Sequence, residues 1–119
     1  MKRIVDELIE DALRELADEG RQRTLWLSTG PPEVSSFVEC MSRLWDDSGL
    51  AAVMEQPGFV YDKKIDEGLH RLDAVLGHVD ADQPVDGLLT DPYLMEARGM
   101  AQTLLEDLRR FGHDAASSS

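Results

Sequence analysis

Apolar residues recur every three or four positions along most of this chain, and no segment alternates apolar and polar residues as a half-exposed β-strand does. The clearest stripe lies at the start of the chain and contains Ile4, Val5, Leu8, Ile9, Ala12, Leu13 and Leu16. Helices that carry one apolar stripe are stable when the stripes of several helices pack together. The sequence therefore predicts an all-α fold, a single-domain bundle or array of four main helices plus one or two short helices.

Turn and capping residues divide this pattern into segments. Gly20 is expected to cap the end of the first helix, Asp62 to cap the start of the helix near residue 61, and Asp91-Pro92 to open the last helix. The predicted helices cover residues 4–19, 33–45, 61–79 and 92–111, with short ones at 49–55 and 85–89. Residues 21–29 fit either another helical turn or a short extended piece. We expect one helical domain over residues 1–112 and a disordered C-terminal tail over residues 113–119.

Two adjacent acids, Asp46 and Asp47, follow Trp45 at the end of the second predicted helix. The helix macrodipole disfavours negative charge at a C-terminal end, so the pair fits better at the start of the next element. There Asp47 or Ser48 can cap the short helix that follows. Neighbouring side chains on a helix end point apart, so a shared catalytic role for the two acids is the weaker reading.

The histidines do not provide a complete metal-binding motif. Glu67 and His70 have the Glu-x-x-His spacing of di-iron bundles, but such a site needs a second copy of that motif, which the sequence lacks. A small enzyme or single-metal site built around His70, Asp73 and His78 stays open as an alternative. A solvent-exposed polar helix face is the favoured reading, so we expect no catalytic residues, no metal and no cofactor.

Charge is the most unusual bulk property of the chain. Its 24 acidic residues outnumber 12 basic ones, for a formal net charge of -12. Such a chain repels nucleic acid and anionic membranes and favours basic partners, although acidity also serves solubility alone. No apolar run approaches the roughly 18 residues that span a bilayer, the N-terminus does not read as a signal peptide, and one cysteine allows no intrachain disulfide. A cytoplasmic location is therefore expected.

Two stretches carry a resemblance to known proteins. VSSFVECMSRLWDDSGL (residues 34–50) and LLTDPYLMEARGMAQTLL (residues 88–105) resemble segments of a group of short bacterial all-helical proteins of unassigned function. In size and acidity the chain is also similar to the helical immunity proteins that neutralise bacterial toxins. The first resemblance implies an all-helical fold and no catalytic residues, and the second implies a basic protein partner.

These observations lead to one preferred function, a non-enzymatic acidic module that binds a basic protein partner such as a toxin, in the manner of an immunity protein or antitoxin. Trp26 is the expected aromatic anchor. The acids expected to attract the partner, besides those of the first helix, are Asp46, Asp47, Asp62, Asp66, Glu67 and Asp73. Charge would then set the association rate and its salt dependence. An inhibitor that mimics nucleic acid and blocks a DNA-binding protein is an alternative, and a homodimer stays open.

Overall fold

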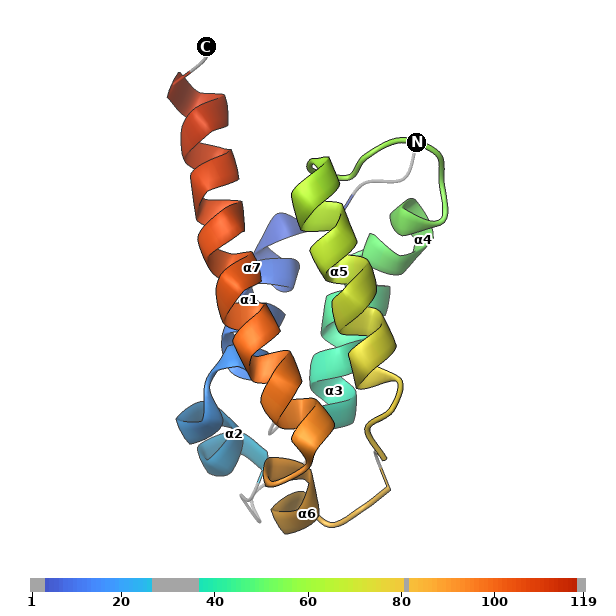
Figure 1. Ribbon diagram of the computed structural model, residues 1–119, viewed down its shortest axis with the longest axis vertical. Coiled ribbons are helices and arrows are strands. Elements are labelled where there is room, and N and C mark those ends of the chain that lie inside the picture. Colours follow the sequence, from blue (N-terminus) through green and yellow to red (C-terminus); the bar gives the residue numbers. More distant parts are fainter. Residues whose placement is uncertain (1–3, 27–36, 81, 118–119) are drawn as a thin grey trace.

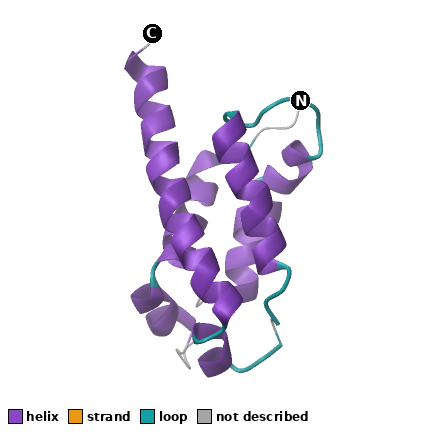
Figure 2. Cartoon of the chain, viewed as in Figure 1, coloured by secondary structure: helices purple, strands orange, loops and turns teal. Residues whose placement is uncertain are grey.

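A computed structural model describes residues 4–26, 37–80 and 82–117, and all regular secondary structure in these ranges is helical (Figure 2). The elements are α1 (Asp6–Ala17), α2 (Glu19–Trp26), α3 (Phe37–Met41), the π-helix η1 (Ser42–Asp47), α4 (Leu50–Met54), α5 (Lys63–Leu76), α6 (Val85–Leu89) and α7 (Pro92–Ser117). The prediction of an all-α single domain is confirmed.

The longest helix, α7, organises the molecule. It packs along both α1 and α5, and it runs opposite to α5 (Figure 1). The η1 segment also packs against α1. α2 and α6 contact each other at the lower end of the molecule in Figure 1. Among the described residues, no helix is both long and apolar enough to cross a bilayer.

The core lies between these helices and follows the apolar stripes of the sequence. Its most deeply buried aliphatic side chains, each no more than 1% exposed, include Ile9, Leu13 and Leu16 of α1, Leu44 of η1, Leu50 of α4, Ile65, Leu69 and Leu72 of α5, and Leu94 of α7. Burying one such side chain contributes about 1.5–3 kcal/mol, so these contacts account for most of the driving force of folding.

Two of the predicted helix starts are confirmed by their capping hydrogen bonds. The carboxylate of Asp62 accepts a hydrogen bond from the Ile65 amide at 2.7 Å, which caps α5. At the start of α7 the Asp91 carboxylate accepts hydrogen bonds from the Tyr93 amide and from the Gln83 side chain, both at 2.8 Å. The bond from Gln83, together with backbone N–H groups, holds the pKa of Asp91 below its usual range.

The predicted cap of the first helix is wrong. α1 ends at Ala17, because Asp18 adopts an extended conformation, and α2 begins at Glu19, so that Gly20 lies inside α2. The Asp18 carboxylate accepts a hydrogen bond from the Arg21 amide at 3.2 Å and so supports the start of α2. Residues 21–26 are therefore helical, and the rest of the ambiguous segment lies outside the described residues.

The predicted place of the two adjacent acids is also wrong. The helix that begins in the described residues at Phe37 continues as the π-helix η1, and Asp46 and Asp47 are its last residues rather than the start of the next element. Residues 33–36 lie outside the described part of the chain.

The prediction that Asp47 or Ser48 is the N-cap residue of the next helix is wrong, because Gly49 holds that position, and Ser48 supports the turn one residue earlier. Its buried hydroxyl accepts a hydrogen bond from the Leu50 amide at 3.2 Å and donates one to the Leu44 carbonyl. Gly49 lies between the two helices with a φ of 81°, a conformation that costs glycine least. The chain therefore turns sharply from η1 into α4.

The last helix is longer than predicted. The sequence places its end near Phe111 and assigns residues 113–119 to a disordered tail, but α7 continues through Gly112 to Ser117. Residues 118 and 119 lie outside the described part.

Candidate functional site

The predicted aromatic anchor, Trp26, lies in the hydrophobic core, and its contact with a partner stays a prediction. Its side chain is only 6% exposed and packs edge-on against Phe37, with ring centroids 5.8 Å apart. Its Nε1 donates a hydrogen bond of 2.9 Å to Oε2 of Glu15, a buried carboxylate whose other oxygen lies 3.2 Å from the Arg43 guanidinium. A tryptophan held in this way stabilises the packing of α2.

Two of the predicted partner-binding acids have structural roles. Asp66 is 9% exposed, and its carboxylate accepts hydrogen bonds from the amides of Val60 (2.7 Å) and Tyr61 (3.0 Å). It fixes the loop that leads into α5, as Asp62 fixes the first turn of that helix. Asp66 is buried and its carboxylate is bound to these two amides, so the structure gives it a role inside the fold, and its contact with a partner stays a prediction.

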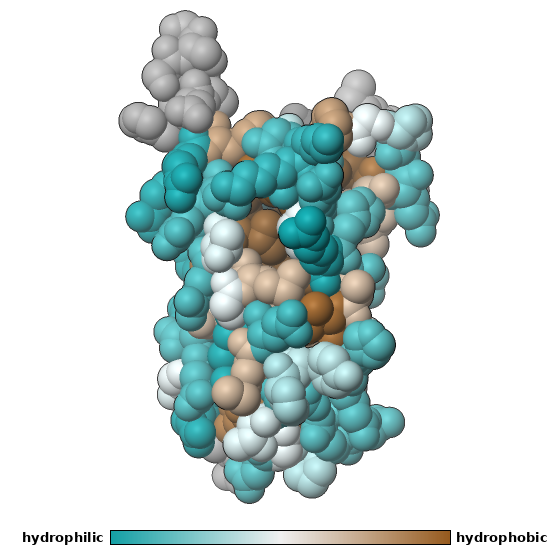
Figure 3. Space-filling model, in the orientation of Figure 1, coloured by the Kyte–Doolittle hydropathy of each residue, from teal (hydrophilic) through white to brown (hydrophobic). Residues whose placement is uncertain are grey.

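A third acid, Glu67, lines a groove between α5 and α7. The volume of this groove is about 420 Å³, and Gly68, Gly99, Met100 and Leu104 contribute to its lining. Figure 3 shows this face, with apolar atoms in the hollow and polar side chains around it. The rim mixes acids with the basic residues Lys64 and Arg71, and Lys64 forms an ion pair of 3.3 Å with Asp107. The groove therefore has no single charge preference.

Two further acids, Asp46 and Asp73, meet at a different pocket, although they lie far apart in the sequence. This pocket has a volume of about 310 Å³. Its lining comes from η1 (Trp45 and Asp46), from α4 and its end (Ala51, Met54 and Glu55) and from α5 (His70 and Asp73). Asp47 is exposed but is not part of this lining. We call these seven residues the acidic pocket.

Local helix geometry places these side chains. His70 and Asp73 are three residues apart on α5 and therefore lie on the same face of that helix. Trp45 and Met54 are half-buried, because each packs against the core with one side and borders the pocket with the other. The wider turn of η1 carries Trp45 and Asp46. π-Helical turns are rare in proteins, and many of those that occur lie at functional sites.

The charge of the acidic pocket is uniform. Three exposed acids, Asp46, Glu55 and Asp73, line it together with its half-buried apolar residues, and no lysine or arginine belongs to its lining. A low-dielectric surface beside several like charges concentrates the field that attracts a counter-ion. The arrangement suits a cationic group that also has an apolar part.

Comparisons of the chain with family models, with curated proteins and with solved structures found no match. The resemblance to short bacterial helical proteins and to immunity proteins therefore stays a prediction from the sequence.

The structure does not assemble the alternative metal site. His78 stacks on Tyr93, with ring centroids 5.0 Å apart and an interplanar angle of 25°, whereas His70 lies at the acidic pocket. Within residues 4–26, 37–80 and 82–117, no group of three or more histidine, cysteine or acidic side chains is arranged to hold a metal ion.

The single cysteine, Cys40, is fully buried, and its Sγ donates a weak hydrogen bond of 3.4 Å to the Ala12 carbonyl. Burial, followed by the nearby Glu15 carboxylate, raises the pKa of the thiol strongly. A thiol that stays protonated and covered is a poor nucleophile, so Cys40 acts as a packed residue of the core.

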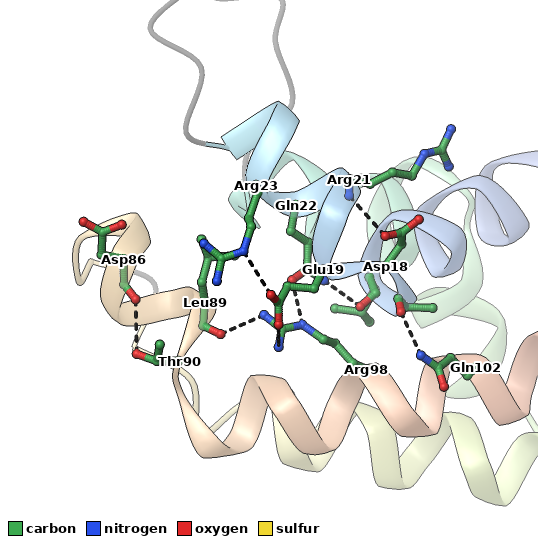
Figure 4. A network of polar contacts seen from close by, with 12 residues as sticks. Asp18, Glu19, Arg21, Gln22, Arg23, Asp86, Leu89, Thr90, Arg98 and Gln102 are labelled. Atoms are coloured by element: carbon green, nitrogen blue, oxygen red, sulfur yellow. Dashed lines mark hydrogen bonds and ion pairs between the residues drawn. The ribbon is translucent and has the colours of Figure 1, made fainter.

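A buried polar network that the sequence did not reveal fixes one end of the molecule (Figure 4). The Arg98 guanidinium donates hydrogen bonds to Oε1 of Gln22 (2.8 Å), to the Leu89 carbonyl (2.8 Å) and to Oε1 of Glu19 (3.2 Å). Gln22 in turn donates to the Leu16 carbonyl at 2.6 Å, one of the carbonyls that the end of α1 leaves without a helical partner. One arginine thus connects α2, α6 and α7.

Proposed function

We propose that this protein is a non-enzymatic module that binds a basic protein partner, and that the acidic pocket is the centre of the binding surface. One observation carries the proposal. The acids Asp46, Glu55 and Asp73 line one pocket together with the half-buried Trp45 and Met54, and no lysine or arginine belongs to this lining.

The physical match is between this pocket and a lysine or arginine side chain. Both side chains have an apolar stem that can pack against Ala51 and Met54, and both end in a cation that the carboxylates neutralise. The net charge of -12 adds long-range attraction, which raises the association rate and makes it sensitive to salt. An exposed enzyme or toxin surface that normally holds an anionic substrate has the required complementary charge. The immunity-protein or antitoxin role belongs to this proposal.

A peptide titration tests the proposal. The probe is a fluorescein-labelled eight-residue peptide of alternating lysine and arginine, and the measurement is its fluorescence anisotropy at 20 and 300 mM NaCl. Each carboxylate that lies about 4 Å from the bound cation in water-like surroundings contributes about 1 kcal/mol. The Asp46→Asn, Asp73→Asn double variant is therefore expected to bind roughly 25-fold more weakly than the unmodified protein at low salt.

The matched control is the Asp82→Asn, Asp86→Asn double variant. It removes the same charge from exposed positions near α6, and neither residue lines the acidic pocket. The control is expected to lose less than about threefold in affinity, because only the long-range attraction changes. Equal losses in both double variants would show that the pocket is not the site, and no binding by the unmodified protein would overturn the function itself.

A further inference from the structure

We infer that the acidic pocket receives the side chain of one arginine of the partner, and that it holds the guanidinium against the ring of Trp45 in preference to a lysine ammonium. This inference rests on the proposed function and specifies which residue of the partner is recognised.

The size of the pocket limits the occupant. A volume of about 310 Å³ lies at the lower end of the range of small-molecule sites, roughly 300–1,000 Å³. It suits an inserted side chain rather than a helix or a strand. Arginine and lysine have stems long enough to carry a charged end from the surface of a partner into such a pocket.

The arrangement of the charges favours a planar cation. The three carboxylates come from three different elements, Asp46 from η1, Glu55 from the end of α4 and Asp73 from α5, so none of them shares a helical turn with another. A guanidinium has five N–H donors spread in one plane and can meet carboxylates in several directions at once, whereas an ammonium is a compact point charge.

The aromatic residue points to the same cation. Trp45 is half-buried at the pocket, and tryptophan gives the strongest cation–π attraction of the aromatic residues. Guanidinium is more weakly hydrated than ammonium and stacks flat on aromatic rings, so less hydration is lost when it covers Trp45. The combination of an aromatic ring with several carboxylates is therefore complementary to arginine.

The two tryptophans allow a direct test by NMR. Their indole N–H groups give two separate signals, and the pair can be assigned with a Trp45→Phe variant. Trp26 is buried and hydrogen-bonded to Glu15, so its signal serves as an internal control for a change elsewhere in the fold. The probes are three eight-residue peptides that alternate serine with arginine, with lysine or with citrulline, the neutral isostere of arginine.

The expected result is a shift of the Trp45 indole signal with the arginine peptide, an affinity about tenfold higher than for the lysine peptide, and no binding of the citrulline peptide. The Trp26 signal should not move. The Asp46→Asn, Asp73→Asn double variant should bind both cationic peptides more weakly and should keep only part of the preference for arginine, because Trp45 is retained.

Two different failures can be told apart. Equal, salt-sensitive binding of the arginine and lysine peptides without a shift at Trp45 would overturn the arginine inference and leave the proposed function standing. If neither cationic peptide binds, the proposed function fails and the inference fails with it.

Discussion

The polar network around Arg98 gives the sharpest prediction about stability. In an Arg98→Met variant the apolar stem is kept, but the donors to Gln22 and Leu89 are removed. Both of these residues are at most 2% exposed, so Oε1 of Gln22 and the Leu89 carbonyl would each be left without the hydrogen bond that Arg98 supplies.

The magnitude follows from these two acceptors. Leaving one buried acceptor unsatisfied costs about 1–3 kcal/mol, which gives about 2–6 kcal/mol for the pair. The ion pair with Glu19 adds little, because the Glu19 side chain is 48% exposed and such pairs contribute about 0–1 kcal/mol. A loss of about 3 kcal/mol in the free energy of unfolding is therefore expected, against a total of roughly 5–15 kcal/mol for a domain of this kind.

Urea denaturation followed by circular dichroism at 222 nm measures this loss. The midpoint should fall while the dependence of the free energy on urea stays the same. Arg21→Met is the matched control, since it removes the same charge from a side chain that points away from the network (Figure 4) and should change stability by less than about 0.5 kcal/mol. A loss below about 1 kcal/mol in Arg98→Met would refute the reasoning.

Three other predictions follow from single residues. The lowered pKa of Asp91 stabilises the fold at pH values above the usual pKa of an aspartate, and this contribution is lost as the pH falls through the folded-state pKa. The difference in stability between the unmodified protein and Asp91→Asn should therefore shrink between pH 5 and pH 2.5, as measured by acid unfolding. Gly99→Ala should raise the melting temperature, since the added methyl group meets open space and the gain in helix propensity is about 1 kcal/mol. Gly68→Ala should raise the melting temperature less, because its methyl group would lie 2.9 Å from Leu104 Cδ2. The reverse order of the two melting temperatures would contradict this packing. Cys40 should react with a thiol reagent only at urea concentrations that unfold the chain, and rapid labelling of the folded protein would disagree with its burial.

The helical class and several element boundaries could be predicted because they depend on local patterns. Asp62, Asp91 and the apolar stripe of α5 act within one or two turns of their own helix, and the structure confirms each of them. The break between α1 and α2 was missed, because it depends on Gln22 satisfying the Leu16 carbonyl, a contact that appears only once the two helices fold back on each other.

The candidate site could be predicted only in part. Asp46 and Asp73 were recognised as acids of interest, but their meeting at one pocket depends on how η1, α4 and α5 are arranged. Trp26 and Trp45 look alike in the sequence, and their roles differ because Glu15 and Phe37 enclose the first, while the second lies at a gap between helices. Exposure of an aromatic residue is a tertiary property that no local pattern encodes.

The close packing of α1 against α7 also has a consequence for synthesis of the chain on the ribosome. α1 leaves the exit tunnel early, but the helix that covers much of its apolar stripe is translated much later, so the nascent chain must keep that stripe from associating with other molecules in the meantime. The acidic face of α1 helps before α7 packs against it, because its charges keep the exposed helix hydrated. We therefore expect the native core to close only after α7 has emerged from the ribosome.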